Sequence, residues 1–459
     1  MSDSMSRRRF LACSTLGTAA LASGCATVPR PRAVPANSKL AHACIGVEGM
    51  GGGDLGNFLN HPRLQVVALC DVDADRLARA ARRVPDARTY TDWRELLAAE
   101  GDRIDSVNVA TPDHMHAAIE LPFLRAGKHV YGQKPLAHDV AECRALTQAA
   151  RRAGVVTQLG TQHASGMGDR LAVKFLQAGL IGRAKHVYLC SNRPGIEAYR
   201  LAGPRPAQGE PPPAALNWDH WLGTAPERPY ARTVYHPAVW RCWQDFGTGW
   251  SGDIGCHIFD AVWKGLGLTA PTTVHAQVQA SWRDTAERRG DTWPQGNHIT
   301  WTFPGNALTE GKELPVEWFD GEFYPPADVQ QLALGDGVSE YPAEAAMIIG
   351  TEGALLLPHG SGPILLPREK YKGTDRTLPK APNHYHRFVD ACLGGEPSNS
   401  PFEIAGPMAE AIILGTVAIR VPDTLLQWDA KRLRVMNSEI AQSLVRRTYR
   451  SGWAVDLKI

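Results

Sequence analysis

The sequence lacks an excess of charge of either sign, since 49 Lys and Arg residues stand against 47 Asp and Glu residues, a formal net charge of +2. A chain with so little net charge has no broad basic field, so we expect no nucleic-acid partner. Uninterrupted apolar runs of the ~18–20 residues that a membrane-spanning helix needs are also missing, which predicts a soluble body. Hydrophobic residues make up 44% of the chain, a globular share that excludes wholesale disorder.

Recognisable metal-binding patterns are missing too. The nine cysteines form no CxxC pair, there is no HExxH, and the HxH pairs are limited to His114/His116 and His384/His386. We therefore predict no metal site, although an Asp-plus-His set can also bind a divalent ion. For the cysteines of the body we expect buried free thiols rather than disulfides.

The N-terminus carries an export signal rather than a fold. Ser6–Leu11 is a twin-arginine pattern, and an apolar stretch follows it. Leu21–Cys25 resembles a lipoprotein cleavage box, with Cys25 as the acylated residue and cleavage without lipid as the alternative. Residues 1–38 are thus predicted to be signal and linker. We expect a periplasmic protein that touches the membrane only through the signal or a lipid at Cys25.

From residue 39 onward the chain divides into two predicted domains, 39–160 and 161–459. The first alternates apolar strands with helices, which indicates a parallel sheet: strands over 41–47, 64–69, 106–110 and 129–131, and helices over 74–83, 116–126 and 139–153. The second has strand-like segments over 186–190, 274–281 and 298–303 between long loops, and a helical tail over 384–415. The predicted fold class is α/β: an N-terminal Rossmann dinucleotide-binding domain plus a C-terminal α+β domain with an open, mostly antiparallel sheet.

A glycine-rich turn follows the first predicted strand. A dinucleotide fingerprint places its three glycines at the tight turn, under the pyrophosphate and at the helix–strand contact, which here are Gly46, Glu48 and Gly51. The middle glycine is missing, and a carboxylate there repels phosphate unless it points away, so we expect the Glu48 side chain to point to solvent. Gly46, Met50 and Gly51 are the predicted cofactor contacts of this turn.

Asp71 closes the second predicted strand, 20 residues after Gly51. An acidic side chain there accepts hydrogen bonds from the adenosine ribose, which favours NAD and makes NADP the less expected cofactor. Arg76 lies five residues further on and is able to reach round to a 2′-phosphate. The alternative interpretation makes Asp71 the N-cap of the helix that starts near Ala74.

Several motifs in order resemble those of the glucose–fructose oxidoreductase/inositol dehydrogenase (Gfo/Idh/MocA) family. They are Val109–His116 (VATPDHMH), Ala126–Leu136 (AGKHVYGQKPL), Trp240–Gly249, Gly252–Asp260 and Tyr449–Trp453. The resemblance covers the chain from about Ala41 to the C-terminus. It implies cofactor contacts from Thr111, Pro112, His116, Gln133 and Lys134. The family's Glu-Lys-Pro motif has Gln133 in place of Glu, which removes a counter-ion from Lys134.

Lys134, Asp253 and His257 are the predicted catalytic residues. Lys134 follows the fourth predicted strand, at the edge where open sheets bind ligands, and the resemblance implies that it hydrogen-bonds a sugar hydroxyl. Asp253 and His257 are four residues apart, so they share one helix face, and histidine is suited to accept a hydroxyl proton near neutral pH. The alternatives are a solvated surface lysine, an N-cap aspartate and a packed core histidine.

The predicted substrate contacts rest on weaker signals. His163, Asn192 and Arg193 follow strand-like segments, and Trp240 and Arg241 offer an aromatic face with a guanidinium, a combination that suits sugar rings. With 13 tryptophans in the chain, most must be structural.

Together these features predict an NAD-dependent oxidoreductase that acts on a sugar or glycoside hydroxyl, as a homo-oligomer. An exported enzyme finds no dependable supply of free dinucleotide, so we expect the cofactor to be held tightly and recycled internally. One alternative is an NAD-dependent glycosidase that works by transient oxidation, elimination, hydration and re-reduction. Another is a non-catalytic sugar-binding lipoprotein, which Glu48 and Gln133 favour.

Overall fold

The computed structural model describes residues 31, 34–35, 38–193 and 203–458. The predicted twin-arginine signal and the acylation site at Cys25 lie outside the described residues.

The N-terminal domain is built on a six-stranded parallel sheet with strand order β3-β2-β1-β4-β5-β6. This is the doubly wound order of dinucleotide-binding folds, and it confirms the predicted Rossmann domain. The strands are β1 (Leu40–Ile45), β2 (Leu64–Cys70), β3 (Arg88–Tyr90), β4 (Ser106–Val109), β5 (His129–Gly132) and β6 (Thr157–Leu159). The helices are α2 (Met50–Leu59), α3 (Ala74–Ala81), α4 (Trp93–Glu100), α5 (His116–Arg125) and α6 (Val140–Ala153).

Local sequence signals explain where these elements begin and end. Side chains of Asp73, Asp92 and Asp139 accept hydrogen bonds from the first backbone N–H groups of α3, α4 and α6. Gly154 ends α6 in a left-handed conformation, at φ +61°, which suits glycine at a helix C-cap. β4 and β5 are buried along their whole length because helices cover both faces of the sheet.

The C-terminal domain holds a nine-stranded sheet of order β13-β12-β11-β7-β10-β9-β8-β14-β15. β7 and β10 are parallel, whereas every other pair in the described sheet is antiparallel, as predicted. The strands are β7 (Ala184–Ser191), β8 (Thr273–Val278), β9 (Asn297–Pro304), β10 (Glu313–Asp320), β11 (Glu344–Gly350), β12 (Ala354–Pro358), β13 (Ile364–Leu366), β14 (Leu426–Asp429) and β15 (Arg434–Val435). The strand predicted over 274–281 ends at Val278, because Ala280 starts the short helix α10 (Ala280–Arg283).

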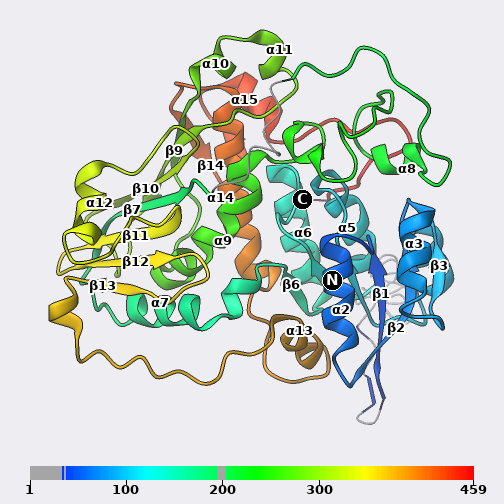
Figure 1. Ribbon diagram of the computed structural model, residues 1–459, viewed down its shortest axis with the longest axis horizontal. Helices are drawn as coiled ribbons and strands as arrows, with labels where there is room; N and C mark the ends of the chain where they lie inside the picture. Colours follow the sequence, from blue (N-terminus) through cyan, green and yellow to red (C-terminus); the bar gives the residue numbers. More distant parts are fainter. Residues whose placement is uncertain (1–30, 32–33, 36–37, 194–202, 459) are drawn as a thin grey trace, which may run out of the picture.

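Three helices cover one face of this sheet: α7 (Met167–Gln177), α9 (Gly249–Leu266) and α14 (Phe402–Arg420). In Figure 1, α9 and α14 stand between the nine-stranded sheet and the helices of the Rossmann domain, and α14 also contacts α6. One cluster of buried apolar side chains continues from the Rossmann strands through these helices. The two domains therefore share a core, and this core fixes the position of the six-stranded sheet relative to the nine-stranded sheet.

Helix α14 is apolar but contains Glu403, Glu410 and Arg420, so it is not the uninterrupted apolar run that the sequence was predicted to lack. It has 19 residues and passes the test of length and hydropathy for a membrane span among the described residues, but 83% of the tested window is buried inside the protein. Glu410 interrupts the apolar sequence and hydrogen-bonds Arg144 of α6. α14 packs as a core helix.

The remaining described elements are short helices and 3-10 turns. They are α8 (Trp218–Leu222), α11 (Ala286–Arg289), α12 (Ala327–Leu334), α13 (His384–Cys392), α15 (Glu439–Leu444) and 3-10 turns at Asp113–Met115, Gln162–Ser165, Val239–Cys242 and Arg368–Tyr371. The seven cysteines of the body are free thiols, of which six are buried and Cys392 is half-buried. This confirms the prediction of free thiols.

Candidate active site

A large cavity of about 620 Å³ opens at the carboxyl edge of the parallel sheet, where doubly wound folds bind their ligands. Nine of the predicted site residues line it: Gly46, Met50, Asp71, Thr111, Pro112, Gln133, Lys134, Trp240 and Arg241. Segments far apart in the sequence close it, because α8 and Trp453 of the C-terminal segment also contribute to its wall. The sequence motifs thus converge on one space.

The glycine-rich turn has the geometry that a dinucleotide fingerprint requires. Gly46 has φ +76°, and a Cβ there would meet the carbonyl oxygen of Ala110 at 2.5 Å. A Cβ on Gly51 would lie 1.9 Å from the carbonyl oxygen of Gly46, so this glycine packs α2 against the turn and does not line the cavity. Met50, on the cavity wall, is the first residue of α2, so the helix N-terminus, which favours anions, begins at this turn.

Glu48 occupies the missing glycine's position and does not simply point to solvent. Its carboxylate accepts a hydrogen bond from Nε of Arg79 at 3.1 Å, and Nε of Arg76 lies 3.5 Å away. The side chain is 36% exposed. The expectation of a solvent-directed carboxylate is therefore corrected: opposite charges on α3 draw it toward that helix.

Asp71 does not cap α3. The N-cap is Asp73, which accepts hydrogen bonds from the backbone N–H groups of Asp75 and Arg76. The carboxylate of Asp71 instead accepts from the backbone N–H groups of Val47 and Asp73, each at 3.0 Å, and burial raises its pKa. Asp71 thus ties the end of β2 to the glycine turn on the cavity wall.

A second, smaller cavity of about 300 Å³ adjoins the first. Met50, Lys134 and Arg241 line both, so the two spaces meet at these side chains. The wall of the smaller cavity is rich in imidazoles and charged groups: Gln162, His163, Arg193, Trp250, Asp253, Ile254, His257, Glu344 and His359 complete it.

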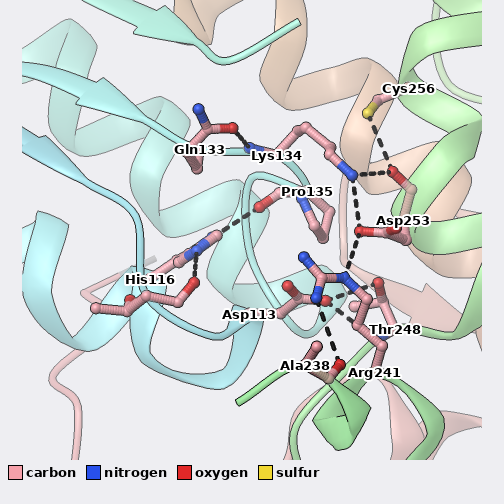
Figure 2. A network of polar contacts seen from close by, with 11 residues as sticks. Asp113, His116, Gln133, Lys134, Pro135, Ala238, Arg241, Thr248, Asp253 and Cys256 are labelled. Carbon is pink, nitrogen blue, oxygen red and sulfur yellow. Dashed lines mark hydrogen bonds and ion pairs between the residues drawn. The ribbon is translucent and has the colours of Figure 1, made fainter. Parts of the chain in front are cut away.

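Lys134 and Asp253 form an ion pair at this meeting point. Nζ of Lys134 donates to Oδ1 of Asp253 at 2.8 Å and to its backbone carbonyl at 3.1 Å, while Nε of Arg241 lies 3.7 Å from Oδ1 (Figure 2). Burial alone would raise the pKa of Asp253, but Lys134 and Arg241 outweigh it and hold that pKa at about 2. Asp253 is therefore a carboxylate at neutral pH.

Asp253 is not the N-cap of α9, since the helix begins four residues earlier and has Thr248 at its cap. Thr248 instead donates from its backbone N–H and its hydroxyl to the buried carboxyl of Asp113 (Figure 2). Burial, and then the negative charge of Asp253, raises the pKa of Asp113. A second carboxyl group thus lies close to the ion pair.

His257 lies one helical turn beyond Asp253 and also lines the smaller cavity. Burial, followed by the charge of Lys134, lowers its pKa well below the ordinary value, so the imidazole is neutral. Its Nδ1 is buried and makes no hydrogen bond among the described residues. The rings of His163 and His359 lie 6.3 Å and 5.5 Å from it, centroid to centroid.

Gln133 has a different partner from the one that the motif suggests. Its Nε2 donates to both oxygens of the buried Asp54 carboxylate at 2.9 Å, and Tyr385 donates its hydroxyl to the same group. Burial raises the pKa of Asp54 to about 6. Lys134 nevertheless has a counter-ion. Asp253 supplies the carboxylate that Gln133 lacks.

Besides Gly51, two predicted site residues, His116 and Asn192, lie outside both cavities. His116 is fully buried, and its ring nitrogens lie 2.8 Å from the carbonyl oxygens of Thr111 and Pro135, so it ties the two cavity-lining loops together (Figure 2). Asn192 donates to the carbonyl of Phe323 at 3.1 Å.

The predicted substrate contacts divide between the two cavities. His163 and Arg193 line the smaller one, whereas Trp240 lines only the larger, where the Arg241 guanidinium lies 4.3 Å from its ring centroid. Arg193 lies 5.4 Å from the Trp250 ring centroid, and its Nε is 3.7 Å from Glu344.

His359, Glu344, Trp250 and Asp113 are cavity residues that the sequence did not single out as site residues. Trp250 and Asp113 stand inside or next to the recognised motifs, so the signal for them was present. Glu344 and His359 come from β11 and the loop after β12, and the topology of the second sheet alone brings them to the site. Within residues 38–193 and 203–458, no group of three or more His, Cys, Asp or Glu side chains is arranged to hold a metal ion.

The fold is that of an oxidoreductase family in which an NAD-binding Rossmann domain precedes a C-terminal alpha/beta domain. Residues 40–161 match the oxidoreductase family with an NAD-binding Rossmann fold, and residues 169–303 match the C-terminal alpha/beta domain of the same family. The chain belongs to the Gfo/Idh/MocA oxidoreductase family.

Curated relatives share part of the sequence. A levoglucosan dehydrogenase from Pseudarthrobacter phenanthrenivorans is 31% identical over 115 residues, 25% of this chain and 29% of the relative. A glycosyl hydrolase family 109 protein from Streptomyces niveus is 33% identical over 151 residues, 31% of this chain and 30% of the relative. The chain thus aligns with less than a third of the length of either protein.

Solved structures share the fold over most of the chain. The WlbA dehydrogenase from Bordetella pertussis, solved with NADH and UDP-GlcNAcA, superimposes with a TM-score of 0.58 over 85% of this chain and 99% of that one, at 16% identity. At this level of identity the likeness concerns the fold alone.

Proposed function

We propose that this protein is an NAD-dependent oxidoreductase that acts on a hydroxyl of a sugar or glycoside. The observation that carries the proposal is the meeting of the two cavities at Lys134: a dinucleotide-sized space on one side and a small polar space on the other. Sugar dehydrogenation needs that arrangement, because a hydride must pass between a cofactor and a substrate that bind side by side.

The residues of the larger cavity fit a dinucleotide. The Gly46 turn and the N-terminus of α2 would hold the pyrophosphate, Asp71 would hold the adenosine ribose, and Lys134 would lie at the nicotinamide end. Bound NAD supplies a hydride acceptor. One side of Gly46 packs against the backbone of Ala110. The other side lines the cavity, where the ligand would bind.

Three side chains would position the substrate hydroxyl and remove its proton: those of Lys134, Asp253 and His257. Asp253 orients the Lys134 ammonium, whose third N–H group can donate to the substrate hydroxyl and stabilise negative charge on its oxygen. His257 is neutral, lines the same cavity and accepts the hydroxyl proton. His163, His359 and Arg193 would contact the other hydroxyl groups of the sugar ring.

The features that favour a non-catalytic binding protein both have partners in the structure. Glu48 is paired with arginines of α3, and Gln133 is paired with Asp54. Because each of these two residues has a partner of its own, neither one prevents a dinucleotide from binding. We therefore retain the enzymatic proposal.

A redox-neutral glycosidase is the second candidate function. The resemblance over 151 residues to a glycosyl hydrolase family 109 protein favours it. The same lysine, aspartate and histidine would serve both reactions. The products distinguish them: an oxidised sugar for the oxidoreductase, and a free aglycone with unchanged cofactor for the glycosidase.

We also propose that the protein is exported by the twin-arginine route, folded around a dinucleotide that it retains and recycles. Recycling requires that a second sugar or ketone takes the hydride back from the reduced cofactor, or that the reaction is redox-neutral overall, as in the glycosidase. The experiment is to heat-denature the purified protein, identify the released small molecules by mass spectrometry, and analyse products from a glycoside panel. Stoichiometric NAD with an oxidised sugar supports the oxidoreductase. A lack of dinucleotide and of any product would overturn the proposal.

A further inference from the structure

Glu48 occupies the fingerprint position that normally carries the second glycine, and it is clamped to helix α3. Its two carboxylate oxygens each receive a hydrogen bond from Arg79, and Nε of Arg76 lies 3.5 Å from Oε2. The hydrogen bonds from Arg79 lower the pKa of Glu48, so the carboxylate is charged at neutral pH.

The clamp stands at the adenosine end of the larger cavity. Glu48, Asp71 and Arg76 all line that cavity, and Asp71 is the residue expected to bind the adenosine ribose. In Rossmann folds that bind NADP, an arginine near this acidic residue accommodates the 2′-phosphate. Arg76 is placed for that task.

Arg76, however, is already committed to carboxylates. Besides Glu48, its Nε lies 3.3 Å from Oδ2 of Asp73. His236, which also lines the cavity, has its Nε2 3.5 Å from the same Asp73 oxygen, but burial lowers the pKa of His236 and leaves it neutral. Three carboxylates, those of Glu48, Asp71 and Asp73, therefore face two guanidinium groups, and the balance is negative.

We infer that Glu48 is a specificity-determining residue: by holding Arg76 and Arg79, it denies the 2′-phosphate of NADP a cationic partner and selects NAD. The inference rests on the proposed function, since it concerns the dinucleotide bound in this cavity. It also explains how a carboxylate stands beside the expected pyrophosphate position, because the two arginines neutralise it.

An ordinary surface ion pair would have the same geometry and no effect on the cofactor. A surface ion pair and a specificity-determining residue differ in one measurable quantity, the ratio of bound NADP to bound NAD. Glu48→Gln keeps the shape of the side chain and removes its charge, so that Asp73 is the one carboxylate left in an ion pair with Arg76 and a phosphate can compete for this guanidinium. Glu403→Gln, at an exposed position in the first turn of α14, makes the same change in net charge far from the cavity.

The experiment equilibrates each purified protein with equal concentrations of NAD and NADP, removes free ligand by gel filtration and measures the bound dinucleotides by mass spectrometry. We expect the unmodified protein to hold NAD, Glu48→Gln to raise the NADP:NAD ratio at least 10-fold, and Glu403→Gln to leave it unchanged. In the double variant Glu48→Gln/Arg76→Ala the ratio should fall back toward that of the unmodified protein.

An unchanged ratio in Glu48→Gln, with NAD still bound, would overturn this inference and leave the proposed function standing. A preference of the unmodified protein for NADP would overturn it as well. If neither dinucleotide binds to the unmodified protein, the proposed function fails together with the inference.

Discussion

Nζ of Lys134 lies 2.8 Å from Oδ1 of Asp253, and this ion pair joins the Rossmann domain to the C-terminal domain where the two cavities meet. The lysine follows β5 and the aspartate lies in the second turn of α9. Both side chains are largely buried. The ion pair therefore fixes the position of the Lys134 ammonium relative to helix α9.

Lys134→Ala and His257→Ala should each lower turnover by ~10²-fold or more, as expected for groups that stabilise or accept the substrate proton. Lys372→Ala, at a lysine that is 72% exposed, serves as the matched control and should keep full turnover. Steady-state rates on the substrate found by the glycoside panel, with circular dichroism to verify folding, give the comparison. Near-native rates in both site variants would place the chemistry elsewhere.

Gln133→Glu restores the family's usual residue and should nevertheless destabilise the protein. It would place a second carboxylate against Asp54, and two buried carboxylates at hydrogen-bonding distance cannot both ionise. We expect a loss of about 1–3 kcal/mol at pH 7.5. One of the two groups binds a proton as the pH falls, so the loss should shrink toward pH 5.

Urea unfolding at the two pH values measures this effect. The double variant Gln133→Glu/Asp54→Asn, which returns the pair to one carboxylate and one amide, should recover most of the stability. A Gln133→Glu protein as stable as the parent at pH 7.5 contradicts the charge relationship described for this pair.

Glu317, on strand β10 of the nine-stranded sheet, should make the stability of the protein depend on pH. Burial raises the pKa of Glu317, but hydrogen bonds with His186 and His298 outweigh it and hold that pKa at about 2, below its ordinary 4.5. The folded state therefore gains stability from this carboxylate above about pH 4.5 and loses it as the pH falls toward 2. Glu317→Gln should cost about 2 kcal/mol at pH 6 and roughly a quarter of that at pH 2.5. Chemical denaturation across this range is the measurement, and a cost that does not vary with pH would exclude the proposed linkage.

Trp453 should slow the escape of the dinucleotide. It lines the larger cavity from the C-terminal segment, where the Arg94 guanidinium lies 4.3 Å from its ring centroid and Arg450 lies 5.4 Å away. Trp453→Ala removes this part of the wall and should raise the dissociation rate of bound NAD about 10-fold, whereas Trp453→Phe should restore most of the retention. Dissociation is followed by exchange with isotopically labelled NAD. Equal rates in all three proteins would show that the C-terminal segment does not hold the cofactor.

The sequence predicted the Rossmann domain because its strands are short apolar runs that end at recognisable residues such as Asp71, Thr111 and Gly132-Gln133-Lys134. It missed α2, β3, α4 and β6. The glycine-rich stretch after Gly49 and the short strands Arg88–Tyr90 and Thr157–Leu159 carry weak periodicity. The catalytic candidates Lys134, Asp253 and His257 were found because each belongs to a motif, and the structure brings them to one cavity.

Partners across the fold were beyond prediction. Glu48 and Arg79 are 31 residues apart, Gln133 and Asp54 are 79 apart, and nothing local to either residue indicates its partner. His116 differs: its motif was recognised, but its buried ring lies against the backbone carbonyls of Thr111 and Pro135 and lines neither cavity.

The central claim, an oxidoreductase site served by a retained and internally recycled cofactor, is tested most directly by counting turnovers of the purified protein on a panel of glycosides with no NAD added. With a second sugar or ketone in the mixture to take up the hydride, we expect many turnovers per protein molecule, and ~10²-fold fewer with Lys134→Ala. A single burst of one turnover per protein molecule, resumed only when free NAD is supplied, would contradict internal recycling and describe an ordinary dehydrogenase.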